Sequence, residues 1–96
     1  MMVVRVLIDR KIRERGEADF LSCLRQLRSK AIGAKGYVSG ETLRVVDDPQ
    51  NYVVVSTWQS MEDWKEWEKN LHRKKINDEI ERLVVRPTVV KVCSHG

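Results

Sequence analysis

The fold is decided by residues 52–64, which read Tyr-Val-Val-Val-Ser-Thr-Trp-Gln-Ser-Met-Glu-Asp-Trp. Residues 52–58 are mostly β-branched or aromatic, which is typical of a strand. Ser60, followed by two acidic residues, predicts the start of a helix, because a serine hydroxyl caps free amides and carboxylates suit the positive end of the helix dipole. The stretch therefore predicts a strand that runs directly into a helix.

The sequence before this stretch predicts two more strands and a helix. Residues 3–9 are apolar and β-branched, as in a strand, and residues 10–16 form a charged extension that we expect to be exposed. Residues 17–32 predict an amphipathic helix with the stripe Phe20, Leu24, Leu27 and Ala31. Residues 37–46 predict a strand that pairs with 52–58 as a hairpin, across a turn at residues 47–51 that is rich in Asx and proline.

The sequence after this stretch predicts a bent helical region and a last strand. The inner stripe of its first part is Met61, Trp64, either Trp67 or Glu68, and Leu71. The inner stripe of its second part, residues 76–84, is Ile76, Ile80 and Leu83. The basic run 72–75 between the stripes indicates the bend. Pro87 ends the helical region, and residues 88–93 predict a strand. The element order βαββαβ indicates an α+β, ferredoxin-like fold with a four-stranded antiparallel sheet, in a single domain over residues 1–96.

Composition excludes several classes of function. The net charge of +4 is small and spread along the chain, and the central strand lacks aromatic stacking platforms, so we expect no nucleic-acid partner. No apolar run approaches the roughly 20 residues of a membrane span, so we expect no membrane partner. Cys23 and Cys93 have no ligand or disulfide spacing, which predicts a cytoplasmic protein without a metal or other cofactor. A domain of 96 residues has room only for a shallow cavity, or for one completed by a second subunit.

The strands also predict a partner. Residues 3–4, 6–8, 53–55 and 89–90 are apolar at both parities, although only one face of the sheet packs on the helices. Such an exposed apolar face is rare in monomers. Packing two sheets face to face would cover it, so we expect a homodimer through the sheet faces.

Three segments resemble a known family: residues 36–43 (Gly-Tyr-Val-Ser-Gly-Glu-Thr-Leu), the turn at residues 47–49 (Asp-Asp-Pro), and residues 56–64 together with Trp67. Together they resemble the antibiotic biosynthesis monooxygenases, a family of small dimeric α+β barrels. The resemblance implies a cleft in each subunit between sheet and helices, and in many members oxygen chemistry without flavin or metal. It does not specify a substrate, because the family includes quinol oxidases, anthrone oxygenases, haem-degrading enzymes and members without known activity.

Such chemistry needs a base to deprotonate a phenol or quinol and an apolar wall to hold its ring. The candidate bases are His72 and Asp9, although His72 lies in a basic run typical of a solvated surface and Asp9 can mark an exposed strand end. Trp58, Trp64 and Trp67 are candidates for the wall, with the alternative that they only fill the core. Tyr37, Ser39 and Glu41 are candidates for a polar lining on one strand face, unless Glu41 pairs with Arg44 or Arg5.

Comparison with the haem-degrading branch separates two functions. That branch resembles this chain at Trp67, but its asparagine and its haem-ligating histidine would fall on Asp9 and near Asn77, and an amide does not replace an imidazole as iron ligand. The first hypothesis is therefore a cofactor-independent monooxygenase of a small aromatic, quinol-like or polyketide-like substrate. The alternative is a non-catalytic dimer that binds a small molecule or haem.

Overall fold

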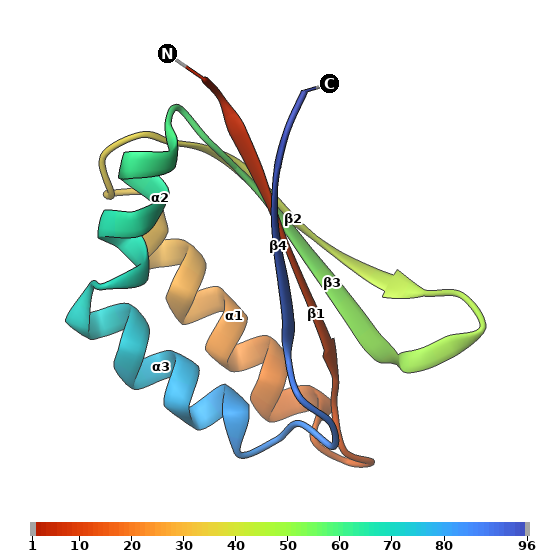
Figure 1. Cartoon of the computed structure of the whole chain (residues 1–96). Helices are drawn as coiled ribbons and strands as arrows, with labels where there is room; N and C mark the ends of the chain where they lie inside the picture. The colour runs from red at the N-terminus through yellow and green to blue at the C-terminus, as the bar shows by residue number, and fades with distance from the viewer. Residues whose placement is uncertain (1, 96) are drawn as a thin grey trace.

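The computed structural model describes residues 2–95; Met1 and Gly96, the ends of the predicted domain, lie outside them. Figure 1 shows a sheet with helices packed on one side of it. The elements in chain order are β1 (Val4–Lys11), α1 (Glu17–Ala31), β2 (Tyr37–Val45), β3 (Asp48–Trp58), α2 (Met61–Glu68), α3 (Leu71–Glu81) and β4 (Val89–Ser94).

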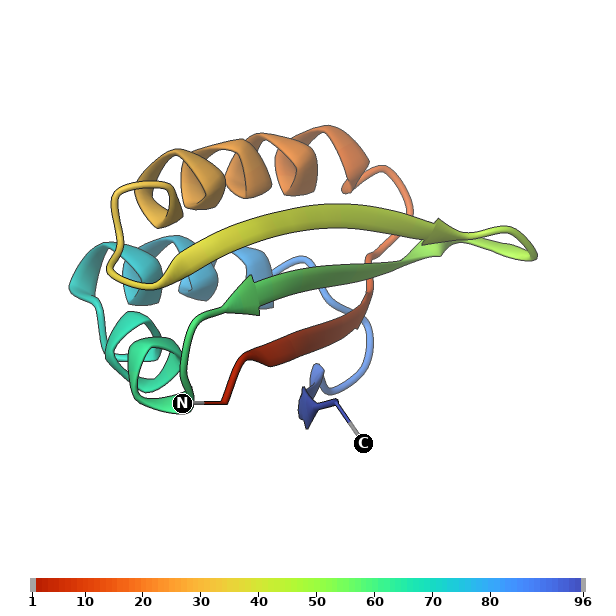
Figure 2. The same cartoon turned by 90° about the horizontal axis from the view of Figure 1, so that it is seen from above.

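The strand order in the sheet is β2-β3-β1-β4, and every neighbouring pair is antiparallel. The predicted ferredoxin-like α+β fold with a four-stranded sheet is confirmed. Figure 2 shows the helices along one face of the sheet, while the other face has no covering layer. The helix-facing side of β1 carries Val4, Val6 and Ile8, all of which are buried.

Two apolar clusters fill the space between the sheet and the helices. One joins β1 and β3 to α2 and to the last residue of α1, and it consists of Val4, Val6, Ile8, Ala31, Trp58, Trp64 and Trp67. The other joins β3 and the residue after β1 to α1, to α3 and to the segment that follows α3, and it consists of Ile12, Phe20, Cys23, Tyr52, Ile76, Ile80 and Leu83. Each large side chain buried in this way stabilises the fold by about 1.5–3 kcal/mol.

The hairpin turn is shorter than predicted. The chain reverses at Val46 and Asp47, and β3 already begins at Asp48, so the predicted turn over residues 47–51 is wrong. Pro49 is tolerated in β3 because β1 ends opposite Asn51 and the register between β2 and β3 is irregular at this point. No regular ladder therefore requires an amide proton at Pro49.

The first strand is longer than predicted. Residues 10 and 11 belong to β1, whereas the sequence predicted that a charged, exposed extension begins at residue 10. Arg10 continues the alternation of Val4, Val6 and Ile8, so its side chain faces the helices, and only 2% of the residue is exposed.

The helical region divides earlier than predicted. The side chain of Ser60 caps α2 by accepting a hydrogen bond from the amide of Asp63 at 3.1 Å, as predicted. The break falls at residues 69–70, before the basic run, because Asn70 caps α3 by accepting from the amides of His72 and Arg73. Leu71 therefore leaves the inner stripe and is exposed, contrary to prediction.

The uncovered face of the sheet carries apolar side chains along its middle. Leu43 pairs with Val53, and Leu7 pairs with Val55, so the side chains of each pair share this face. Leu43 is 47% exposed, whereas Val55 is buried by its neighbours. Within residues 2–95, no helix is both long and apolar enough to cross a membrane.

Candidate functional site

A cavity of about 230 Å³ lies between the sheet and the helices. Strand residues along its lining are Ile8, Arg10, Tyr37, Gly40, Glu41, Thr42, Val54, Ser56 and Trp58; helix residues are Leu21, Leu24, Arg25, Leu27, Arg28, Ala31, Trp64, Trp67 and Arg73. The size suits a small ligand, since pockets for drug-sized ligands measure roughly 300–1,000 Å³. All five residues predicted to bind substrate border this cavity: Tyr37, Glu41, Trp58, Trp64 and Trp67.

The aromatic residues form a continuous cluster around Trp58. The ring centroids of Trp58 and Trp67 are 6.0 Å apart with nearly parallel planes, and that of Trp64 lies 5.9 Å from Trp58 at a tilt. The ring of Tyr37 meets Trp58 edge-on at 5.3 Å. The tryptophans therefore do both things that the sequence left open, because they fill the core and also border the cavity.

The positions of Tyr37 and Trp58 are fixed by small residues. The indole Nε1 of Trp58 donates to the hydroxyl of Ser56 at 3.0 Å, which satisfies its only polar group. The hydroxyl of Tyr37 lies beside Gly40, where a side chain would meet it. These contacts hold the aromatic wall in one arrangement.

Glu41 borders the cavity differently from the way the sequence predicted. Tyr37 pairs with Trp58 and Ser39 with Thr57, so β2 contains a bulge between them and its alternation reverses. Glu41 pairs with Val55 and its side chain shares the uncovered face, opposite to that of Tyr37. The predicted shared strand face of Tyr37 and Glu41 is therefore wrong, because the sequence gives no signal for the bulge.

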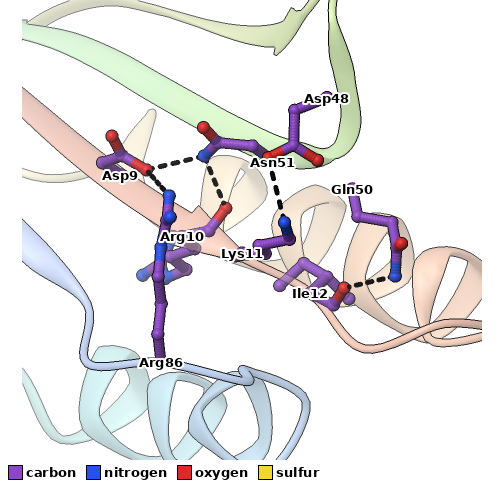
Figure 3. Close-up of polar contacts among 8 residues, drawn as sticks. All are labelled: Asp9, Arg10, Lys11, Ile12, Asp48, Gln50, Asn51 and Arg86. Atoms are coloured by element: carbon purple, nitrogen blue, oxygen red, sulfur yellow. Dashed lines mark hydrogen bonds and ion pairs between the residues drawn. The ribbon is translucent and has the colours of Figure 1, made fainter.

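Asp9 lies outside the cavity. It is adjacent to Ile8 and Arg10 on β1, so its side chain projects from the other face of the sheet. Figure 3 shows its contacts there: the carboxylate accepts from Asn51 at 2.6 Å and from Arg86 at 3.2 Å. The Asp9 side chain is 42% exposed, so it is a partly solvated surface carboxylate with two partners, and the predicted base at Asp9 does not border the cavity.

His72 also lies outside the cavity, at the exposed first turn of α3. The following residue, Arg73, borders the cavity instead, and its guanidinium carbon lies 5.3 Å from the centroid of the Trp64 ring. Consecutive helical residues point about 100° apart, and here the direction of Arg73 is toward the cavity, whereas His72 points away from it into solvent. The structure thus places neither predicted base against the cavity.

Sequence reasoning missed the cationic character of the site. Arg10, Arg25, Arg28 and Arg73 all border the cavity, together with a single acidic residue, Glu41. Arg28 donates to the carbonyl oxygen of Gly40 and so links α1 to β2 beside the cavity. The sequence could have shown that Arg10 faces the helices, because it continues the two-residue alternation of Val4, Val6 and Ile8. Nothing in the sequence distinguishes the other three, Arg25, Arg28 and Arg73, from surface arginines.

A family model for antibiotic biosynthesis monooxygenases matches residues 2–79, from the start of β1 to most of α3. The chain belongs to this family. The family resemblance of the sequence is thereby confirmed, and the cavity between sheet and helices is where that resemblance places a cleft. Comparison with curated proteins finds no match.

Solved structures share the fold across the whole chain. A conserved protein from Methanosarcina mazei Go1 has a TM-score of 0.95 at 12% identity, with 100% of this chain and 95% of that chain covered. Rv0793 from Mycobacterium tuberculosis has a TM-score of 0.89 at 17% identity, with 98% and 95% covered. SnoaB, a cofactor-independent oxygenase from Streptomyces nogalater, has a TM-score of 0.89 at 14% identity, with 100% and 95% covered. At such identities these likenesses establish the fold alone, and the chain is a monooxygenase-family member with its own set of cavity residues.

Proposed function

We propose that this protein is a cofactor-independent monooxygenase of a small, planar aromatic substrate, quinol-like or polyketide-like, that binds in the cavity. The observation that carries the proposal is the aromatic wall of Tyr37, Trp58, Trp64 and Trp67 along a cavity in a chain of this family. Flat apolar side chains hold a planar ring by stacking and edge contacts. SnoaB, which shares the fold, is described as a cofactor-independent oxygenase and supports the same reaction class.

The reaction needs no external reductant. A phenol with a free ring position reacts with one molecule of oxygen to give a quinone and one molecule of water. The ring carbon gains a bond to oxygen and loses its hydrogen, the phenol loses its proton, and the substrate supplies all four electrons that reduce oxygen. The protein has to favour the deprotonated phenol, exclude bulk water and orient the ring.

Oxygen uptake tests this proposal. Chelator-treated protein should consume oxygen with a member of a panel of quinols and anthrones, in a ratio of one oxygen to one substrate. The product should be the quinone from an anthrone or the hydroxyquinone from a quinol, with water and no hydrogen peroxide. Uptake no faster than with heat-denatured protein across the panel would contradict the proposal. Trp67→Phe should change the substrate preference within the panel, because Trp67 borders the cavity.

The alternative function is that of a dimer that binds a small molecule or haem without turning it over. The placement of His72 and Asp9 outside the cavity supports it, since neither side chain borders the cavity in this structure. A ligand that binds in the cavity and consumes no oxygen would support this alternative.

We also propose that two chains pair through the uncovered faces of their sheets. Leu7, Leu43, Val53 and Val55 provide an apolar band on that face, and face-to-face sheets about 10 Å apart would bury it. The helices occupy the opposite face, so pairing would leave the cavity of each chain accessible. The two cysteines are free, which fits the reducing cytoplasm that we propose as the compartment.

A further inference from the structure

Arg10 is a buried cation inside the cavity. It follows Val4, Val6 and Ile8 on the helix-facing side of β1, and 2% of the residue is exposed. Its Nη2 donates to Oδ1 of Asn77 on α3 at 3.0 Å. Its Nε is buried without a hydrogen-bond partner among the described residues. A buried donor without a partner is costly, so Arg10 is poised for a further acceptor.

The charge of Arg10 is not neutralised by an ion pair within residues 2–95. Glu81 attracts it at longer range, but its carboxylate accepts from the hydroxyl of Thr88 at 2.9 and 3.1 Å. Burial lowers the pKa of Arg10 to about 10, an effect that Glu81 opposes and Arg73 reinforces. The guanidinium is therefore charged at neutral pH, and a buried unpaired charge is a strong driving force for binding an anion.

A second cation strengthens this argument. Arg73 is half-buried, packs over Trp64 and borders the same cavity, and burial lowers its pKa as well. Its charge repels that of Arg10. Two guanidinium groups that repel each other beside a cavity are both stabilised when an anion enters, and the exposed Arg25 and Arg28 add positive charge from α1.

We propose that Arg10 binds an anionic oxygen group on the aromatic ligand of this cavity. The ligand class is a planar aromatic anion, either a carboxylate or a phenolate, with its ring against Trp58 and Trp67. This deepens the proposed function by naming the substrate's charge, and it rests on that function only in assuming that the substrate occupies the cavity. Arginine suits the task because its planar fork of N–H donors matches two acceptor positions. Asn77 holds one side of the fork in place.

The test compares matched probes by calorimetric titration at pH 7 without oxygen. 2-Naphthoate and 2-naphthamide have the same ring and nearly the same shape, but only the first is charged. We expect the wild-type protein to bind 2-naphthoate about tenfold or more tightly than the amide, since charge-assisted hydrogen bonds in dry sites have this magnitude. Arg10→Met, which keeps most of the side-chain volume, should abolish the preference for the anion and leave binding of the amide nearly unchanged.

A matched control separates local contact from general attraction. Arg82→Met removes the same charge from an exposed residue that does not border the cavity, and it should preserve the preference. If Arg10→Met does not fold, Arg10→Lys keeps the charge but loses the fork, and we expect it to reduce the preference. Equal binding of the two probes to the wild-type protein would overturn the proposal. So would an equal loss of both probes in Arg10→Met, because Arg10 would then only shape the cavity.

A third probe distinguishes the two sources of the anion. 2-Naphthol is neutral in water at pH 7, and the absorption band of its anion should appear on binding if the cavity stabilises a phenolate. Appearance of this band in the wild type and its loss in Arg10→Met supports the phenolate, whereas selectivity for 2-naphthoate alone supports the carboxylate. Oxygen uptake is measured separately. Anion selectivity without uptake on any substrate would refute the monooxygenase and keep the anion site. Uptake without anion selectivity would support the monooxygenase and refute the anion site.

Discussion

The phenolic hydroxyl of Tyr37 lies so close to Gly40 that a Cβ atom on Gly40 would be 2.6 Å from it. Residues three positions apart in a regular strand face opposite sides of the sheet. The bulge in β2 reverses the alternation between Tyr37 and Ser39, so Tyr37 and Gly40 face the same side. Tyr37 in turn meets Trp58 edge-on at 5.3 Å, so the glycine helps to set the aromatic wall of the cavity.

Substitution of Gly40 by alanine should therefore alter the cavity more than the fold. The added methyl group has to displace the Tyr37 ring from Trp58, at a stability cost of about 1 kcal/mol. We expect weaker binding of 2-naphthoate, measured by calorimetry beside the melting temperature. Gly33→Ala is the control, since the nearest atom to its new Cβ would be at an ordinary 3.7 Å. Unchanged binding in Gly40→Ala would show that Tyr37 does not touch the ligand.

Trp67 offers a second test of the wall. Trp67→Phe removes part of a ring that stacks on Trp58 and belongs to the core cluster, so it should lower the free energy of unfolding by about 1–2 kcal/mol. It should also enlarge the cavity and change the relative affinity for one-ring and two-ring ligands. Phe20→Leu is the control, because Phe20 lies in the other cluster and does not border the cavity. An identical ligand profile in Trp67→Phe would leave Trp67 a core residue only.

The sequence predicted the elements well where local signals act alone. The Ser60 cap, the helix predicted at residues 17–32 and the order of the elements along the chain follow from side-chain chemistry and periodicity; the structure confirms them, with the helix ending one residue earlier, at Ala31. The predicted turn at residues 47–51 was wrong because Pro49 was expected to interrupt the strand, whereas proline is tolerated in a strand where the hydrogen-bond ladder is irregular. The predicted position of the break between the helices was wrong because Asn70 caps α3, so the helix begins before the basic run and includes it.

The site was predictable only in part, because local spacing determines the direction of some side chains and tertiary contacts determine that of others. Trp64 and Trp67 lie one helical turn apart, so their common direction could be derived from spacing. Arg10 could have been found from the two-residue alternation of β1, but arginine is seldom buried and was assigned to an exposed extension. The direction of Glu41 depends on a bulge, and no residue type marks one reliably.

Cys23 should be an unreactive thiol. It is buried, and this burial is the main cause that raises the pKa of its thiol. The carboxylate of Glu79, whose Oε2 lies 3.7 Å from the sulfur, raises the pKa further. A raised pKa means less thiolate at any pH below it, and the thiolate is the reacting form. In a Cys93→Ser variant at pH 8, an aromatic disulfide reagent should therefore react slowly, and denaturant should restore the full rate. Rapid reaction of the native variant would show that this part of the α1–α3 contact opens readily.

The proposed dimer predicts that a charge on the uncovered face separates the chains. Leu43 is 47% exposed on that face, so Leu43→Lys should leave the fold intact while it halves the mass measured by light scattering. Val46→Lys is the control, since Val46 is 95% exposed in the hairpin turn and away from the apolar band. A wild-type protein with the mass of a single chain at micromolar concentration would exclude the dimer.

The role of His72 as a base stays a prediction, and the position of His72 in the structure argues against that role. The residue is exposed on the first turn of α3; its backbone amide donates to Asn70, and its side chain makes no hydrogen bond within residues 2–95. His72→Ala should therefore change neither the rate of oxygen uptake nor its pH profile, and Asp9→Asn should weaken the contact with Arg86 without altering ligand binding. The comparison needs a full pH profile, because a general base makes the rate depend on its own protonation and so adds an inflection to the profile. If the inflection is present in the wild type and disappears in His72→Ala, α3 must move in the working enzyme to bring His72 to the cavity. If the profile is flat in both proteins, deprotonation depends on the positive charge around the cavity, which lowers the pKa of the bound phenol instead of removing its proton through a side chain.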